Sequence, residues 1–285
     1  MAKNTVFFNG KFYTGKEIPA SMLDRGLFFG DGVFESMRCY EKKIPGLNHH
    51  LSRLQHGLEV LQIHPSWDEK ELTQKIFDTV EAGGHKDSYL RINVTRGPWL
   101  GSIPPFGAAE PHLMIVCRPF LGFREELYEK GFQTLTLQTR RNETSPLCQI
   151  KSLNYLDNIL GRMQALEKGM DEGIFLNTKG VLAEGTASNI FLVQGRRLIT
   201  PSVEDGVLKG VTREIILEKA PDLNLDIEIC SIRPEEIFSA DEALLTNSSL
   251  GVIAWVKSDG KPVGNGRPGK ITRQLRSLYS KLLGS

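Results

Sequence analysis

The order of strand-like and helix-like segments restricts the fold of this chain more than any other sequence feature. Leucines recur at helical spacing over 49–62 and 68–82, whereas alternating or continuous apolar residues indicate short strands over 90–95 and 113–117. An Asn-Gly turn predicts a hairpin over 6–13. Because strands and helices are mixed without strict alternation, the pattern predicts an α+β (α/β) fold and not a Rossmann sheet.

The length of 285 residues suits one large domain or two modest ones, and a Pro- and Gly-flanked segment near position 120 predicts two. We expect a small α/β domain over 1–120, an interdomain linker over 121–130 and a large domain over 131–285. In the large domain, strands are expected over 134–138, 174–176, 189–193 and 243–245, and helices over 153–166, 211–220 and 271–282.

Charge and cysteine usage exclude several classes of protein. The formal net charge of +1, from 35 basic and 34 acidic residues, argues against a partner that is a nucleic acid or a membrane surface. No apolar run reaches 18 residues, and the polar residues 1–4 and 9–11 leave no signal-peptide core. The four cysteines form no Cys-x-x-Cys pair, so we expect neither a zinc site nor disulfides. Three are expected to be buried thiols in a cytoplasmic protein.

Lys151 is the leading candidate for chemistry, because it lies where a polar strand end gives way to an apolar helix. Lysine is the only side chain that forms a stable yet exchangeable imine with an aldehyde cofactor, and it must be neutral to do so. A helix N-terminus disfavours an ammonium ion, which suits that task. Taken alone, Lys151 is better explained as a surface lysine, as most lysines are, and its neighbours in the sequence reverse that interpretation.

Three further motifs follow Lys151 in order. Glu184 begins a small-residue stretch, and such a carboxylate can keep a pyridine nitrogen protonated; the alternative is a loop glutamate in water. The segment 209–213 starts a helix whose free N–H groups can bind phosphate, or it is a plain capping turn. The segment 246–249 offers hydroxyls and N–H groups for a second contact. An amine, an acid and two anion-binding turns together predict an enzyme that uses pyridoxal 5'-phosphate.

The helix over 49–62 carries other polar candidates. Arg53 could reach inward at one edge of the core, although a solvated arginine is the simpler interpretation. His49, His50 and His56 have no carboxylate at metal-ligand spacing, so they are interpreted as surface histidines and no metal is predicted.

Taken together, these segments resemble the fold-type IV, class IV aminotransferase family of pyridoxal-phosphate enzymes. The resemblance covers nearly the whole chain and is carried by residues 29–35, 53–54, 150–155, 184, 188–189 and 208–213. It implies a two-domain fold like that of D-amino-acid aminotransferases. It also implies a homodimer with the active site between the two domains, closed by residues of the neighbouring subunit.

The resemblance implies a role for each matching residue. Lys151 would be the Schiff-base lysine and the general acid/base, Glu184 would pair with the pyridine nitrogen, and Tyr155 would bond the phenolic oxygen. Contacts to the phosphate or the rest of the cofactor are implied for Arg53, Leu208, Gly210, Val211, Thr212, Asn247 and Ser248. Contacts to an amine or amino-acid substrate are implied for Phe34, Ser36, Arg91 and Ser249.

The branch of the family is less clearly indicated. Ser36 stands where branched-chain aminotransferases usually have glycine, and Thr246-Asn247-Ser248 stands where they tend to have Ser-Gly-Thr; both features resemble aminodeoxychorismate lyases. In contrast, Ala254 replaces a proline of many lyase-like sequences, and Tyr89-Leu90-Arg91 resembles an aminotransferase segment. Arg91 either binds a carboxylate or lines the solvent face of its strand.

The sequence therefore favours 4-amino-4-deoxychorismate lyase, which forms 4-aminobenzoate and pyruvate. The alternative is an aminotransferase acting between a branched-chain amino acid, D-amino acid or R-amine and a 2-oxo acid. A non-catalytic pyridoxal-phosphate carrier is a third possibility, against which the intact Lys151, Glu184 and Tyr155 argue.

Overall fold

The structure, a computed structural model, describes residues 5–14, 24–98, 103–105 and 110–283. The chain divides into two compact units. The first unit consists of Met1–Leu121 together with Ile150–Asn154, and the second of Gly122–Gln149 and Tyr155–Ser285. Residues 1–4, which entered the argument against a signal peptide, lie outside the described residues.

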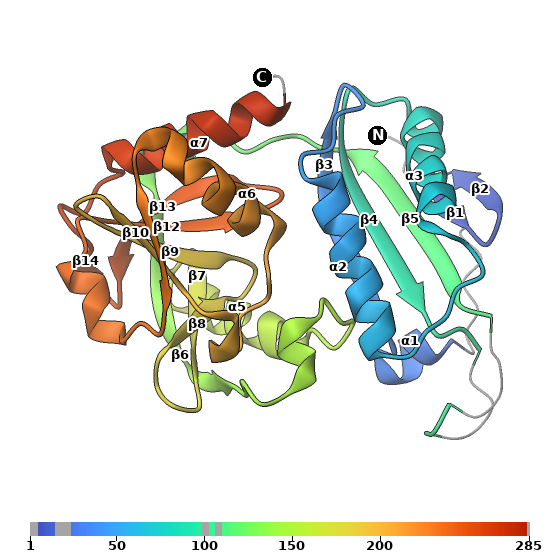
Figure 1. The fold of residues 1–285 in the computed structure, drawn as a ribbon, viewed down its shortest axis with the longest axis horizontal. Helices are drawn as coiled ribbons and strands as arrows, with labels where there is room; N and C mark the ends of the chain where they lie inside the picture. Colours follow the sequence, from blue (N-terminus) through green and yellow to red (C-terminus); the bar gives the residue numbers. More distant parts are fainter. Residues whose placement is uncertain (1–4, 15–23, 99–102, 106–109, 284–285) are drawn as a thin grey trace. The chain divides into compact units, whose positions relative to one another are not determined.

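A five-stranded antiparallel sheet forms the first unit, with strand order β2-β1-β5-β4-β3 (Figure 1). The strands are β1 (Thr5–Phe8), β2 (Lys11–Thr14), β3 (Gly32–Tyr40), β4 (Asp87–Thr95) and β5 (His112–Pro119). The predicted hairpin is confirmed, because β1 and β2 pair across an Asn9-Gly10 turn in which both residues have positive φ. The predicted interior strand is also confirmed, since β5 lies between β1 and β4.

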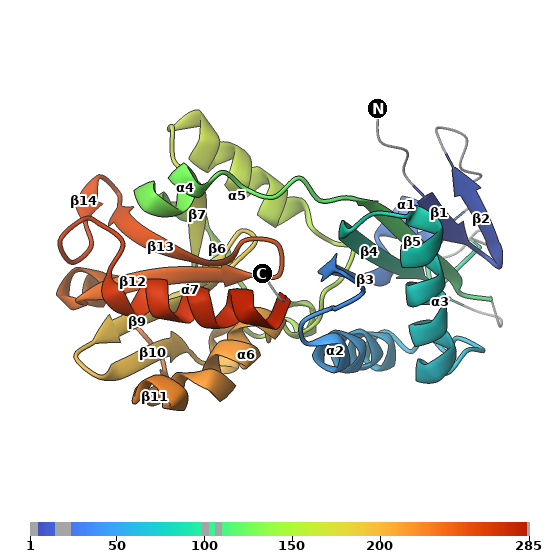
Figure 2. The ribbon, with the colours of Figure 1, turned by 90° about the horizontal axis from the view of Figure 1, so that it is seen from above.

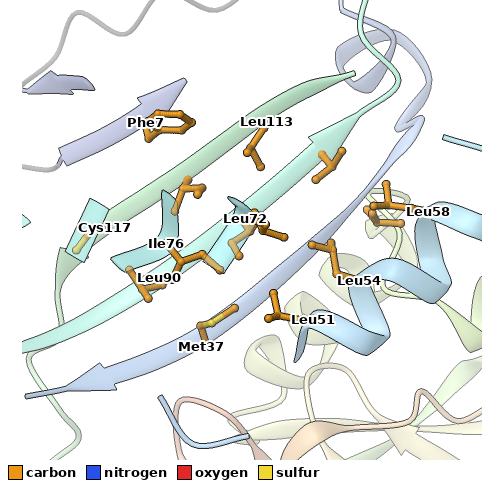
Figure 3. Packing of buried hydrophobic residues seen from close by; sticks show 14 of the residues in the cluster. Phe7, Met37, Leu51, Leu54, Leu58, Leu72, Ile76, Leu90, Leu113 and Cys117 are labelled. Carbon is orange, nitrogen blue, oxygen red and sulfur yellow. The ribbon is translucent and has the colours of Figure 1, made fainter. Parts of the chain in front are cut away.

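Three helices accompany this sheet: α1 (Arg25–Phe29), α2 (Leu47–Val60) and α3 (Glu69–Gly83). The two helices predicted from leucine spacing are confirmed as α2 and α3, which lie along the same face of the sheet (Figures 1 and 2). A capping box between Asp68 and Glu71 fixes the start of α3. Leucines of both helices pack against buried side chains of β3, β4 and β5, including Met37, Leu90 and Cys117 (Figure 3).

The second unit contains a nine-stranded sheet of order β11-β10-β9-β12-β13-β6-β7-β8, with β14 paired to β13. Its strands are β6 (Phe132–Arg141), β7 (Glu172–Asn177), β8 (Leu182–Gly185), β9 (Asn189–Gln194), β10 (Arg197–Pro201), β11 (Asp226–Cys230), β12 (Glu242–Asn247), β13 (Gly251–Ser258) and β14 (Lys261–Pro262). The pairs β6–β7, β13–β6 and β10–β11 are parallel, and the other pairs are antiparallel.

The helices of the second unit are α4 (Glu125–Lys130), α5 (Leu156–Glu167), α6 (Val211–Lys219) and α7 (Lys270–Leu283), with short 3₁₀ helices η1 (Pro146–Gln149), η2 (Val203–Asp205), η3 (Ala220–Leu223) and η4 (Pro234–Ser239). Helix α5 packs against β6 and β7, whereas α7 packs against β12 and β13. No helix within the described ranges is both long enough and apolar enough to cross a membrane.

Helix α5 packs through its small residues. Gly161 lies so close to β6 that a Cβ built there would be 2.6 Å from Leu137 Cδ1. Asn158 and Ala165 are buried on the same side. The large apolar residues face outward with 48–71% exposure: Leu156, Ile159, Leu160, Met163 and Leu166. This outward row is called the α5 stripe below.

The predicted start of this helix was wrong. The helix was predicted to begin directly after Lys151, but α5 begins at Leu156. The intervening residues are extended, because Phe34 N donates a hydrogen bond to Lys151 O and Leu153 N donates to Gly32 O, both at 2.9 Å. A backbone paired to β3 in this way cannot also form the first turn of a helix. The helix-dipole argument for a neutral Lys151 therefore does not apply.

The expectation of three buried cysteines was also wrong. All four are free thiols, but only Cys39 and Cys117 are fully buried. Cys230 ends the outermost strand β11, and Cys148 lies in η1, so both remain partly accessible.

Candidate active site

Lys151 lies in the first unit, on a short extended segment added alongside β3. Val33 and Ser152 form an isolated antiparallel bridge, which sets the register of this segment. Lys151 Nζ lies 4.4 Å from the centroid of the Phe34 ring. A cation–π contact of this kind helps to hold an amine in place.

Phe34 belongs to a row of residues on one face of β3 and β4. Side chains on a strand alternate between faces, and cross-strand pairing puts Ser36 opposite Arg91 and Phe34 opposite Asn93. Arg91 Cζ lies 3.9 Å from the Phe34 ring centroid, and Arg91 Nε donates a 3.1 Å hydrogen bond to Asn93 Oδ1. Two cations, Lys151 and Arg91, therefore contact one aromatic ring. We call Phe34, Ser36, Arg91 and Lys151 the lysine face.

Tyr89 completes this face. Its hydroxyl donates a 2.9 Å hydrogen bond to Ser36 Oγ, so the serine that follows Phe34-Glu35 orients a tyrosine that lies two residues from Arg91. Ser36 and Arg91, both predicted as substrate contacts, are thus neighbours in the folded unit.

The opposite face of β3 carries a buried acid that sequence analysis did not identify. Glu35 has no exposed surface. Its Oε1 accepts a hydrogen bond from Arg53 Nε, and its Oε2 accepts from Arg53 Nη2 and His50 Nδ1, all at 2.7 Å. The interpretation of His50 as a surface histidine was wrong, because it is 1% exposed. Arg53 reaches inward to Glu35 and is not the solvated helix arginine of the simpler interpretation.

The charges in this cluster follow from the geometry. Burial alone opposes ionisation of Glu35, but Arg53 and His50 outweigh burial and lower the pKa of this carboxyl to about 2. Burial also lowers the pKa of His50, more than the nearby carboxylate raises it. Arg53 is the larger of the two influences that keep Glu35 ionised, and His50 adds to the same effect through its charge and its hydrogen bond.

In the second unit, Glu184 at the end of β8 is also buried and paired. Its Oε1 accepts a 2.9 Å hydrogen bond from Arg141 Nη2, and its Oε2 accepts a 3.0 Å bond from Leu208 N. Asn189 Nδ2 lies 3.4 Å from Oε2 and donates at 2.9 Å to Leu208 O. Glu184 and Leu208, which are both predicted to contact the cofactor, are thus joined to each other by a hydrogen bond. Arg141 was not predicted.

The loop that follows Glu184 is fixed by a second buried acid, Glu172. Its Oε1 accepts hydrogen bonds from the hydroxyl and the backbone N–H of Thr186 and forms a 2.9 Å ion pair with Arg162. Its Oε2 accepts a 3.1 Å bond from Ser188 Oγ. The Tyr155 hydroxyl, at the start of α5, donates a long 3.4 Å bond to Thr186 O.

The start of α6 offers backbone donors. Gly210 is its N-cap and has no side chain to cap the first turn, while Val211 and Thr212 are buried. A Cβ at Gly210 would lie 1.7 Å from Asn189 Oδ1, so only glycine fits there. Because the dipole and free N–H groups of a helix start attract anions, this turn can hold a phosphate.

The turn after β12 is held by its own asparagine. Asn247 Oδ1 accepts hydrogen bonds from Ser249 N at 3.0 Å and Leu250 N at 2.8 Å. The buried Thr246 Oγ1 has no hydrogen-bond partner among the described residues. A buried hydroxyl of this kind is costly unless something fills the role of partner, which suits a ligand-binding turn.

The predicted site residues thus fall into two groups. The first unit holds Phe34, Ser36, Arg53, Arg91 and Lys151, and the second holds Tyr155, Glu184, Leu208, Gly210, Val211, Thr212, Asn247, Ser248 and Ser249. An amine, a buried carboxylate, a phenol, a guanidinium and helix-start N–H groups are the donors and acceptors that pyridoxal phosphate requires, so the residues present fit this cofactor.

Comparison with known proteins identifies the relatives of this chain. Residues 32–257 match the family described as amino-transferase class IV. A putative branched-chain-amino-acid aminotransferase of Methanocaldococcus jannaschii is 31% identical over 97% of this chain and 96% of its own length. An aminodeoxychorismate lyase of Bacillus subtilis is also 31% identical, over 97% and 94%. A D-alanine aminotransferase of Bacillus licheniformis is 29% identical, over 95% and 94%.

Solved structures share the fold. The branched-chain aminotransferase of the archaeon Thermoproteus uzoniensis, solved with norvaline, has a TM-score of 0.91 at 29% identity and covers 99% of this chain and 95% of its own. Another branched-chain amino acid aminotransferase, solved with pyridoxamine 5'-phosphate, has a TM-score of 0.93 at 26% identity, covering 98% and 94%. The 4-amino-4-deoxychorismate lyase of Pseudomonas aeruginosa has a TM-score of 0.85 at 28% identity, covering 97% and 98%. The predicted α+β fold of type IV is thereby confirmed.

Proposed function

Because the chain belongs to the class IV aminotransferase family, we propose that it is a pyridoxal 5'-phosphate enzyme that moves an amino group between an amino acid and a 2-oxo acid. The family resemblance predicted from the sequence is confirmed by the match over residues 32–257. The observation that carries the amino-acid part of the proposal is the lysine face, where the Lys151 amine and the Arg91 guanidinium contact the same Phe34 ring.

Pyridoxal phosphate supplies an aldehyde that condenses with primary amines and a ring that accepts the electrons left behind when a proton departs. Lys151 would hold this aldehyde through its amine and would move the proton at the α-carbon of the substrate. Phe34 limits where the lysine amine can lie, because the ring attracts it within 4.4 Å.

The remaining contacts hold the cofactor. Glu184 would keep a proton at the ring nitrogen, and Arg141 balances the negative charge of that buried carboxylate. Tyr155 would bond the phenolic oxygen, its hydroxyl proton then leaving the long bond to Thr186 O. Arg53 would contribute a cation for the phosphate, and the first N–H groups of α6, at Val211 and Thr212, would contribute hydrogen bonds.

Arg91 gives the substrate its chemical class. A guanidinium that contacts the same aromatic ring as the catalytic amine can bind the α-carboxylate of an amino acid in a bidentate manner. The Tyr89–Ser36 hydrogen bond favours the aminotransferase branch, because it gives the Ser36 hydroxyl a task in placing the aminotransferase-like Tyr89-Leu90-Arg91 segment. The presence of serine at position 36 is therefore compatible with both branches and is no longer evidence for the lyase alone.

Aminodeoxychorismate lyase is the second candidate. It is favoured by the Thr246-Asn247-Ser248 sequence and by the 31% identical lyase of Bacillus subtilis. Both reactions begin with the same proton removal by Lys151, so they differ only in the substrate that the pocket accepts.

One set of incubations separates the candidates. The holoenzyme is mixed with L-leucine, D-alanine, L-glutamate or an R-amine, and conversion of the cofactor to its pyridoxamine form is followed by absorbance. In parallel it is mixed with aminodeoxychorismate, and fluorescence of 4-aminobenzoate is followed. We expect conversion by an amino acid and slow or no 4-aminobenzoate release. Rapid 4-aminobenzoate release without pyridoxamine formation would establish the lyase instead.

Arg91 is tested in the same assay. Arg91→Leu should raise the KM for a carboxylate-bearing donor by about tenfold or more, since a charge-assisted hydrogen-bonded pair is lost. Arg196→Leu is the control, because Arg196 is an exposed arginine in the turn between β9 and β10 of the second unit. An unchanged KM in Arg91→Leu would remove the carboxylate assignment.

A homodimer is proposed on the α5 stripe. Its residues, at positions 156, 159, 160, 163 and 166, repeat at the three- and four-residue spacing by which two helices pack together. A second copy of the chain presents the same stripe, as a two-fold interface requires. Leu160→Glu should halve the mass measured by light scattering, whereas Leu121→Glu, at a 94% exposed leucine outside the stripe, should not. A dimer that survives Leu160→Glu would place the interface elsewhere.

A cytoplasmic location is proposed from the cysteines. All four are free thiols, as is usual in a reducing compartment. Cell fractionation that found the protein outside the cytoplasm would contradict this.

A further inference from the structure

Arg53 is ordered by a carboxylate before any ligand arrives. Glu35 accepts two parallel hydrogen bonds from Nε and Nη2 of Arg53, and both are 2.7 Å long. His50 Nδ1 donates to Glu35 Oε2, also at 2.7 Å, so the carboxylate itself is held in place. Glu35 and His50 are each at most 1% exposed, so bulk water does not compete for these contacts.

We propose that Glu35 is a positioning residue for phosphate binding, because it fixes the Arg53 guanidinium so that the phosphate of the cofactor meets an arginine that is already ordered. Arginine loses more side-chain entropy on ordering than most residues. A guanidinium held in advance through its planar fork avoids that loss when the anion binds. The inference rests on the proposed function for one point only, namely that Arg53 binds this phosphate.

A purely electrostatic view of Glu35 predicts the opposite result. A carboxylate next to Arg53 cancels positive charge, so its removal should strengthen the binding of any anion. Positioning predicts that its removal weakens phosphate binding, although the local charge becomes more positive. The sign of the effect therefore separates the two views.

The test compares pyridoxal phosphate with pyridoxal, which differ only in the phosphate. Dissociation constants of both are measured on the apoenzyme by absorbance titration, and their ratio reports what the phosphate contributes. For Glu35→Gln we expect the advantage of the phosphorylated form to fall by about tenfold or more, while pyridoxal binding changes less than about twofold. An unchanged or increased advantage, or an equal loss for both ligands, would overturn the inference.

Two reference variants make the outcome specific. Arg53→Gln shows whether this arginine contributes to phosphate binding at all. If it leaves the ratio unchanged, the assignment of Arg53 in the proposed function fails; if only Glu35→Gln leaves it unchanged, the positioning role alone fails. Asp87→Asn alters another carboxylate that accepts two hydrogen bonds from one arginine, Arg38, and that has no assigned contact to the cofactor, so it should leave the ratio unchanged.

Circular dichroism of the apoprotein shows whether Glu35→Gln folds. A second substitution keeps the inference testable if it does not. Glu35→Asp keeps the negative charge but shortens the side chain by one methylene, so the carboxylate no longer reaches both Arg53 nitrogens. It should reduce the advantage of the phosphorylated ligand in the same direction. A folded Glu35→Asp protein with the wild-type ratio would overturn the inference.

Discussion

Acidification of the apoprotein should reveal the contribution of Glu35 to stability. The pKa of Glu35 is lowered from 4.5 to about 2 in the folded chain, so the folded state binds this proton more weakly than the unfolded state does. The stabilisation is therefore fully present above about pH 4.5 and is lost as the pH falls toward 2. At about 1.4 kcal/mol per pH unit, the whole effect is about 3 kcal/mol, of which about 2 kcal/mol is lost by pH ~3.

The assay is urea unfolding of wild type and Glu35→Gln, followed by circular dichroism from pH ~7 to pH ~3. At neutral pH the variant should be less stable by about 3–5 kcal/mol, because it leaves the Arg53 guanidinium buried without its acid. As the pH falls to ~3, this difference in free energy of unfolding should shrink by about 2 kcal/mol. Other carboxylates titrate equally in both proteins and cancel. A difference that stays constant with pH would refute the reasoning.

Three other substitutions test the site and its support. Lys151→Ala should leave no borohydride-fixed cofactor on the peptide that contains position 151, and a label found on another lysine by mass spectrometry would reject the assignment. Glu184→Gln should bind the cofactor yet slow exchange of the substrate α-proton into heavy water by about 100-fold; near-normal exchange would count against its role. Gly161→Ala should cost about 1–3 kcal/mol in urea unfolding, because the added Cβ would lie 2.6 Å from Leu137 Cδ1. An unchanged midpoint would show that α5 can shift.

Local patterns in the sequence were sufficient for elements whose stability is local. The leucine spacing of α2 and α3 and the Asn-Gly turn between β1 and β2 depend on residues within a few positions of one another, and all three were predicted. The resemblance to the family identified the candidate site residues. From spacing alone, the main motifs could also be explained without a function, for example as a surface lysine, a loop glutamate or a capping turn.

Helix α5 shows where periodicity misleads. An apolar row at helical spacing usually marks the buried face, but here Gly161 and its small neighbours are buried and the α5 stripe is exposed. Periodicity identifies which residues share a face; it does not identify what that face contacts. The small residues at 158, 161 and 165 were the available signal for close packing.

The buried ion pairs of Glu35 and Glu184 were missed because the partners of each acid are distant in the sequence. His50 and Arg53 lie 15 and 18 positions from Glu35, and Arg141 lies 43 positions from Glu184. No strand was predicted at β3, although the alternation of Val33, Met37 and Cys39 would have put Glu35 on the buried face. A charged residue on such a face needs a partner, which the sequence does not name.

Stability alone does not account for the Glu35 cluster. Replacing a buried ion pair by apolar side chains of similar volume is often neutral or stabilising. All three members of the cluster bond through their side chains, so a triple replacement, Glu35→Met, His50→Leu and Arg53→Met, can remove every one of these contacts together. We expect the apoprotein to unfold in urea with a free energy within about 1–2 kcal/mol of wild type. The same protein should show a smaller preference for pyridoxal phosphate over pyridoxal than wild type does, because only the α6 contacts to the phosphate remain. If the triple variant unfolds as readily as Glu35→Gln, the cluster is needed for the fold itself. The presence of the cluster would then be no argument for a role in phosphate binding.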